Sequence, residues 1–205
     1  MRLLSAVDTM FYRMESERTP MHIGALMTFR LPDGAGPDYV RTLYDAFCEL
    51  AFLPFPFDSQ IVDGIFPEWH TVQPDSDYHV RLSALPYPGS ETDLGKLVAR
   101  LHANPLDMRR PLWEAHFIEG LSGGRFAMYF KAHHCAVDGM GAINTIKKWL
   151  STEPDRYVPL SEAGPKAEVP DRNRIASVAY ELWNRTTDGV TGSAEMVKNL
   201  VGMIG

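Results

Sequence analysis

The segment His-His-Cys-Ala-Val-Asp-Gly, at positions 133–139, is the part of this chain best suited to chemistry. An imidazole with an unperturbed pKa of about 6.5 accepts a proton at neutral pH with useful driving force. An alcohol or amine that attacks an activated acyl group loses a proton as it reacts, so it needs such a base. A histidine at the end of a strand, where the chain turns into a helix, is well placed to be that base.

The two histidines of this segment are expected to point in different directions. Side chains alternate between the two faces of a strand, so His134 should end an apolar row, while His133 faces the other way. One row comprises Phe126, Met128, Phe130, Ala132 and His134, and the other comprises Ala127, Tyr129, Lys131 and His133. A lone histidine here would more often be a hydrogen-bonded core residue. The nearby Asp138 and Gly139 favour a catalytic base at His134 instead.

Asp138 has two possible roles. It lies where a helix is expected to start, so its carboxylate could accept the unpaired N–H groups of the first turn as an N-cap. It could also be the orienting acid of a catalytic triad, and of these two roles we favour the structural one. Gly139 allows the backbone to turn without a Cβ clash.

A metal site built from His133, His134 and Asp138 is disfavoured, because adjacent strand residues point to opposite faces and would not converge on one ion. The sequence contains no P-loop, dinucleotide-binding glycine motif or nucleophile elbow. The other histidines lack a paired spacing and are interpreted as ordinary polar or core residues; they are His22, His70, His79, His102 and His116.

The elements expected to position the motif begin with a β-hairpin. Its strands cover Trp113–Glu119 and Arg125–Ala132, on either side of a glycine-containing loop. A helix follows from Gly139. Further helices are predicted over 5–16, from Pro37 through Phe47 and over 91–103, and further strands over Met21–Leu31, Glu68–Val72 and Tyr78–Leu85. Prolines exclude regular structure over 53–57.

Composition narrows the function classes. The net charge of −6 argues against a nucleic-acid partner and against a polybasic contact with anionic lipid. No apolar run is long enough to span a membrane. Two cysteines, Cys48 and Cys135, are too few for a disulfide framework, which favours a reducing compartment.

The chain length favours one main domain, predicted over residues 1–150. Residues 151–172 are rich in proline and charge and are typical of a linker. Residues 173–205 show two helical patterns, the second with a strong apolar stripe that predicts a missing partner segment. The stripe comprises Met196, Val197, Leu200, Val201 and Ile204.

Three motifs make the chain resemble the bacterial wax ester synthase/diacylglycerol acyltransferases, a family of the chloramphenicol acetyltransferase-like superfamily. The motif His133-His134-x-x-x-Asp138-Gly139 matches the superfamily's active-site signature. Pro111-Leu112-Trp113 is similar to the family's Pro-Leu-Trp motif, and the opening residues, Leu4–Asp8 and Pro20–Gly24, are similar to the family's start. The resemblance implies an α/β (α+β) fold, one chloramphenicol acetyltransferase-like half with a mixed, mostly antiparallel sheet flanked by helices.

The resemblance also implies an activity. His134 would deprotonate a fatty alcohol or diacylglycerol hydroxyl, which attacks the acyl-CoA thioester to give a wax ester or triacylglycerol. His133 would support the site, Asp138 would hold its geometry, and Pro111, Leu112 and Trp113 would shape or brace the acyl channel. Acyl-CoA is then a substrate, and no cofactor is expected.

Members of this family are more than twice as long and have two similar halves. The chain is therefore expected to be an N-terminal half that is active with the C-terminal half of the same enzyme. A cytoplasmic location is expected, and contact with the inner membrane or a lipid-droplet surface stays open. Two alternatives are a condensation-domain-like, amide-forming acyltransferase and a non-catalytic half that binds lipid or a partner chain.

Overall fold

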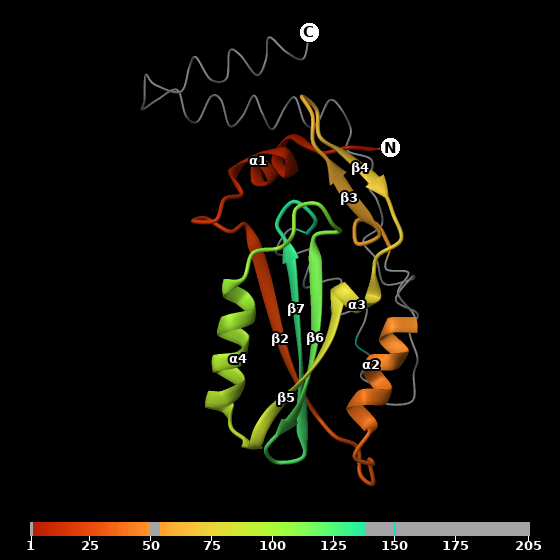
Figure 1. Cartoon of the computed structure of the whole chain (residues 1–205), viewed down its shortest axis with the longest axis vertical. Coiled ribbons are helices and arrows are strands. Elements are labelled where there is room, and N and C mark those ends of the chain that lie inside the picture. The colour runs from red at the N-terminus through yellow and green to blue at the C-terminus, as the bar shows by residue number, and fades with distance from the viewer. Residues whose placement is uncertain (1, 50–53, 138–149, 151–205) are drawn as a thin grey trace. The chain divides into compact units, whose positions relative to one another are not determined.

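The computed structural model of the chain describes residues 2–49, 54–137 and 150 (Figure 1). Several of the predicted features lie outside these residues. They are Asp138, Gly139, the helix from Gly139, the linker over 151–172 and the helical tail over 173–205. The proposed domain boundaries therefore stay predictions.

A four-stranded sheet in the order β2-β7-β6-β5 carries the double histidine (Figure 1). Its strands are β2 (His22–Arg30), β5 (Val80–Gly89), β6 (Trp113–Leu121) and β7 (Arg125–His133). Strand β7 is antiparallel to both β2 and β6, whereas β5 is parallel to β6. The expected mixed, mostly antiparallel sheet is confirmed.

Strands β6 and β7 form the predicted hairpin. Gly123 and Gly124 in its loop have φ values of 77° and 64°. Side chains with a Cβ rarely adopt this left-handed region, so glycine suits both positions. The tight reversal sets β6 and β7 in register and brings Trp113 opposite Ala132, next to the double histidine.

Two helices cover opposite faces of the sheet (Figure 1). Helix α2 (Tyr39–Glu49) packs Leu43, Tyr44 and Phe47 on one face, and α4 (Glu91–Ala103) packs Leu94, Leu97 and Leu101 on the other. The side chains of β7 divide between these faces as predicted. Phe126, Met128, Phe130 and Ala132 join the α2 side, and Ala127 and Tyr129 join the α4 side.

Local capping explains where two helices begin. Helix α1 (Ala6–Met14) starts after Ser5, whose Oγ accepts from the Asp8 N–H at 3.1 Å. Helix α4 starts with a capping box, in which Ser90 and Asp93 each accept the other's backbone N–H. Both helices were predicted, and α4 ends at Ala103, as expected before a proline.

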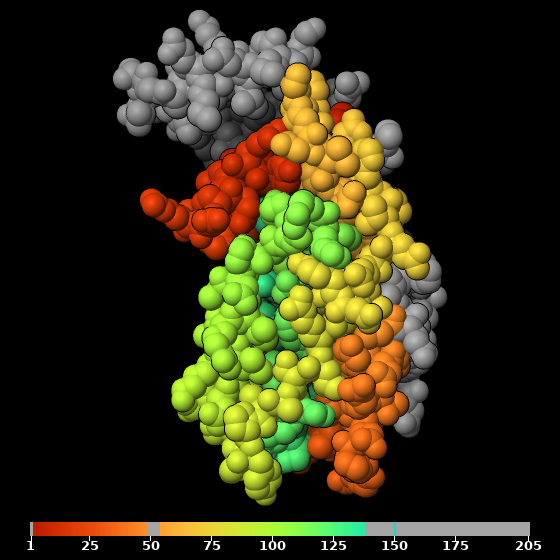
Figure 2. Space-filling model, in the orientation of Figure 1, coloured from red at the N-terminus to blue at the C-terminus, as the bar shows by residue number. Residues whose placement is uncertain are grey.

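A second, three-stranded antiparallel sheet lies beside α1 in the order β1-β4-β3. Its strands are β1 (Arg2–Leu3), β3 (Ser59–Val62) and β4 (Glu68–Thr71). Phe11 and Tyr12 of α1 pack in the same cluster as residues of this sheet. In Figure 2 the red N-terminal segment lies against the orange and yellow segment that includes β3 and β4. The small sheet therefore supports α1 close to the end of β7 (Figure 1).

The strand predicted over Tyr78–Leu85 is wrong at its start. Residues Ser76–His79 form a short helix, α3, and the strand begins only at Val80. The N–H groups of Tyr78 and His79 both donate to the Asp75 carbonyl, which closes a turn before the strand.

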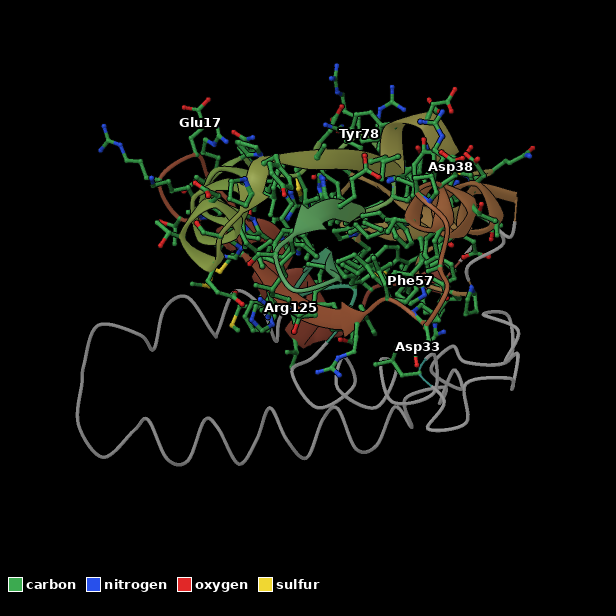
Figure 3. All side chains as sticks on the ribbon, turned by 90° about the horizontal axis from the view of Figure 1, so that it is seen from below. Glu17, Asp33, Asp38, Phe57, Tyr78 and Arg125 are labelled. Carbon is green, nitrogen blue, oxygen red and sulfur yellow. The ribbon has the colours of Figure 1, made fainter. Side chains whose placement is uncertain are left out.

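Strands β1 and β3 were not predicted. The two residues of β1 are too few to show alternation. The proline-rich segment is a turn over 55–58, as expected. It places Phe57 among the packed interior side chains (Figure 3).

Candidate active site

His134 is the first residue after β7, at the start of a turn. Its backbone N–H donates to the Met21 carbonyl at 2.7 Å. Its half-buried ring stacks on Phe11 of α1, with ring centroids 4.8 Å apart and planes inclined by 15°. No described residue hydrogen-bonds to a His134 ring nitrogen, so packing and backbone hold the ring while its nitrogens stay available to a substrate.

His133 is buried more deeply than His134 and is 1% exposed. Its Nδ1 accepts the Cys135 N–H at 3.1 Å, and its Nε2 lies 3.2 Å from Glu15 Oε2. Burial lowers the pKa of His133, although the Glu15 carboxylate opposes that shift. Both ring nitrogens are engaged by the protein, so this geometry favours His134 over His133 as the base.

Glu15 is a site residue that the sequence analysis missed. It follows α1 directly, and its Oε2 accepts the Met21 N–H as well as facing His133. One sequence signal could have indicated a role for it. A carboxylate at a helix C-terminus is disfavoured by the helix dipole, which suggests a tertiary partner.

The predicted Pro111-Leu112-Trp113 motif lies in the core beside the double histidine. The Leu112 carbonyl accepts the His133 N–H at 3.0 Å, and Leu112 packs in a cluster with Cys135. Trp113 donates its indole N–H to the Phe57 carbonyl at 2.8 Å. These contacts brace the end of β7, while a part in shaping an acyl channel stays a prediction.

A buried ionic cluster lies two residues before His133. Lys131 Nζ donates to the carbonyls of Leu101 and Asn104, at 3.0 and 2.9 Å, and lies 3.2 Å from Glu114 Oε2. Burial would raise the pKa of Glu114, but the His116 hydrogen bond and the Lys131 charge outweigh it and lower the pKa. The cluster fastens the end of α4 to β7.

A second set of hydrogen bonds joins β2, α4 and β7 on the same face. The Tyr129 hydroxyl lies 2.7 Å from His102 Nδ1, and the His102 carbonyl accepts from His22 Nε2 at 2.7 Å. His22 is also the ladder partner of His133. Burial, with a smaller effect of the Glu114 charge, raises the pKa of Tyr129 to about 12. Through these bonds His22 and His102 join β2 to α4.

Cys135 is a poor candidate for a nucleophile. Burial, together with the Asp8 charge, raises the pKa of its thiol, which opposes formation of the reactive thiolate. Within the described ranges, no three side chains of metal-ligating types are grouped to hold an ion. Among the described residues of the motif, His134 therefore stays the candidate base.

Comparison with known proteins gives a family match. The model of the wax ester synthase/diacylglycerol acyltransferase catalytic domain matches residues 4–205. A Mycobacterium tuberculosis protein, Rv2285, provisionally named a diacylglycerol O-acyltransferase, is 54% identical over 205 residues. That match covers all of this chain and 46% of the relative, so the chain spans about half the length of the curated relatives it matches.

Solved structures agree with the fold. A wax ester synthase/diacylglycerol acyltransferase from Marinobacter aquaeolei VT8 superposes with a TM-score of 0.74 at 34% identity, over 90% of this chain and 46% of that one. A condensation domain that releases the chain from the enacyloxin polyketide synthase superposes with a TM-score of 0.57 at 14% identity, over 92% of this chain and 39% of that one. At that identity the second likeness concerns the fold.

Proposed function

Because the chain belongs to the wax ester synthase/diacylglycerol acyltransferase family, we propose that it transfers a fatty acyl group from acyl-CoA to a hydroxyl acceptor. The acceptor is a long-chain alcohol or a diacylglycerol, and the product is a wax ester or a triacylglycerol. The chain performs this reaction together with the C-terminal half that its relatives contain.

The observation that carries the proposal is the state of the His134 ring. It is half-buried, stacked on Phe11, and without a hydrogen bond from a described residue to its nitrogens. His133, by contrast, has both nitrogens occupied. An imidazole held in this way is suited to accept a proton from a bound substrate.

The reaction then proceeds in two proton-balanced steps. His134 removes the proton of the acceptor hydroxyl as its oxygen attacks the thioester carbonyl carbon. The carbon–sulfur bond breaks as the tetrahedral intermediate collapses, and the His134 imidazolium returns the proton to the departing CoA thiolate. No covalent acyl-enzyme forms, which agrees with the raised pKa of Cys135.

The other motif residues support this base. His133 anchors the end of β7 through its backbone bond to Leu112, and Trp113 braces the neighbouring strand. Asp138 and Gly139, which lie outside the described residues, are assigned by the family resemblance to holding the geometry of the site. Pro111, Leu112 and Trp113 are assigned to shaping or bracing the acyl channel. These roles extend the family resemblance to the positions of this chain that match its motifs.

The test measures thiol release and ester formation with the protein expressed from its complete reading frame. Palmitoyl-CoA is supplied with hexadecanol, with a diacylglycerol or with no acceptor. We expect CoA release that depends on an acceptor and equals the ester formed. No acceptor-dependent release from palmitoyl-CoA would contradict the proposal.

The alternatives give different outcomes in the same assay. A condensation-type enzyme would use a carrier-bound thioester and an amine, forming an amide rather than an ester. A non-catalytic half would bind lipid or its partner chain and would leave turnover unchanged when His134 is replaced. Either outcome would contradict the proposed ester-forming reaction with His134 as the base.

Contact with a lipid surface stays a prediction. Within the described residues, no helix combines the length and apolar character needed to cross a bilayer. Helix α1 does expose Val7, Met10 and Met14, which suits a surface contact. Vesicle flotation with and without Met10→Ser would test this, since binding that is unchanged by the substitution would exclude α1 as the contact.

A further inference from the structure

We propose that Glu15 is a positioning residue for the double histidine, acting on the His133 ring and on the His134 backbone together. This inference rests on the proposed role of His134 as the base. Glu15 directly follows α1, 118 positions before His133, and its side chain is mostly buried, with 11% of its surface exposed. Its Oε2 is the shared acceptor for two groups that lead to the site.

The first route is through the His133 ring. Because the Cys135 N–H donates to Nδ1, that nitrogen carries a lone pair rather than a proton. The proton of the neutral ring therefore lies on Nε2, which faces Glu15 Oε2 at 3.2 Å. Glu15 thus stabilises the Nε2–H tautomer of His133, in which Nδ1 can accept the Cys135 N–H.

The second route is through the backbone of Met21. Its N–H donates to the same Glu15 oxygen, and its carbonyl accepts the His134 N–H at 2.7 Å. Met21 immediately precedes β2, so Glu15 joins the end of α1, the start of β2 and the end of β7. Because α1 also carries Phe11, one helix supplies both the carboxylate and the ring that packs on His134.

These two routes meet at adjacent residues. If the carboxylate is lost, the buried Nε2–H of His133 and the Met21 N–H both lose their acceptor. The turn that begins at His134 then loses a constraint on each side, although no group that touches substrate has changed. Displacing a catalytic base by about 1 Å can reduce the rate on the order of 10²-fold.

The test compares Glu15→Ala and Glu15→Gln, with Glu17→Gln as the matched control. Glu17 is exposed on the rim of the molecule (Figure 3). Glutamine keeps one side-chain oxygen that can accept both N–H groups, so we expect most of kcat to survive. Alanine should lower kcat on the order of 10²-fold, with KM for palmitoyl-CoA changed less than about threefold.

The histidine spectrum separates positioning from a general loss of stability. Nitrogen-15 NMR should show the Nε2–H tautomer of neutral His133 in the wild type and in Glu15→Gln. In Glu15→Ala it should show a mixture of the Nε2–H and Nδ1–H tautomers. The double variant Glu15→Ala/His133→Ala should be no slower than the slower single variant, because both substitutions break one unit. An unchanged tautomer, or kcat within about threefold of the wild type in Glu15→Ala, would overturn the inference.

Two further results keep the outcome clear. If Glu15→Ala does not fold, Glu15→Asp decides, because its shortened side chain should not reach Met21 and His133 together; wild-type kcat in that variant would refute the role. Activity that survives in His134→Ala would refute the proposed function. Activity lost in His134→Ala but kept in Glu15→Ala would refute the role of Glu15 alone.

Discussion

Lys131 and Glu114 face each other across the β6–β7 ladder, with Nζ and Oε2 3.2 Å apart and both side chains almost wholly buried. The same ammonium group donates to two carbonyls at the end of α4. This ion pair is therefore also the fastening between a helix and the strand that carries the double histidine.

Replacing Lys131 with methionine should destabilise the fold by about 3–5 kcal/mol, because Glu114 is then left as a buried charge without its cation. Chemical denaturation measures the free energy of unfolding. Lys96→Met is the matched control, since Lys96 is exposed on α4. A Lys131→Met variant within about 1 kcal/mol of the wild type would show that the pair contributes little to stability.

Substitution by alanine should change stability in opposite directions at two glycines, Gly24 and Gly95. A Cβ at Gly24 would lie 2.5 Å from the Tyr129 hydroxyl oxygen and 2.7 Å from its ring, so Gly24→Ala should cost about 1–3 kcal/mol. Gly95 lies on the exposed side of α4 with nothing near its missing Cβ. Gly95→Ala should stabilise by about 0.5–1 kcal/mol. Thermal denaturation of both variants measures the two changes in stability. A change in the same direction for both variants would contradict the prediction.

Stability should fall as the pH drops below about 6.5. Burial is the main cause that lowers the pKa of His22, His79 and His133. Between the unfolded pKa of about 6.5 and the lower folded values, the unfolded chain binds protons that the folded chain does not. The free energy of unfolding then decreases with falling pH, by up to about 1.4 kcal/mol per unit for each histidine.

Denaturation at several pH values between about 5.5 and 7.5, where histidine titrates, measures how the free energy of unfolding changes with pH. His79→Asn keeps a donor for the Trp113 carbonyl, to which His79 Nδ1 bonds at 2.8 Å, and should flatten the slope. His70→Asn, at a partly exposed histidine, is the control. An unchanged slope in His79→Asn would mean that His79 does not contribute.

The parts of the fold that the sequence predicted are those whose signals are local. The hairpin follows from alternation and two glycines, and α4 follows from Ser90, Asp93 and its apolar spacing. Alternation also divided the side chains of β7 between the two faces of the sheet. By contrast, the start of β5 was wrong, because the turn at Asp75 forms within a segment that has strand-like composition.

The long-range parts of the site could not be predicted in the same way. Glu15 meets His133 across 118 positions, and Phe11 meets His134 only after α1 is placed by the small sheet. The burial of Lys131 depends on partners from α4 and β6 that alternation within one strand does not reveal. Single-strand patterns give the direction of a side chain but not its partner.

The central claim is that His134 is the base, and the most direct measurement is kcat for acyl transfer by His134→Ala. We predict a fall on the order of 10²–10⁴-fold with unchanged melting temperature, because the variant removes proton transfer and leaves the anchoring of His133 intact. His70→Ala should keep wild-type kcat. A folded His134→Ala variant with kcat within about threefold of the wild type would contradict the claim.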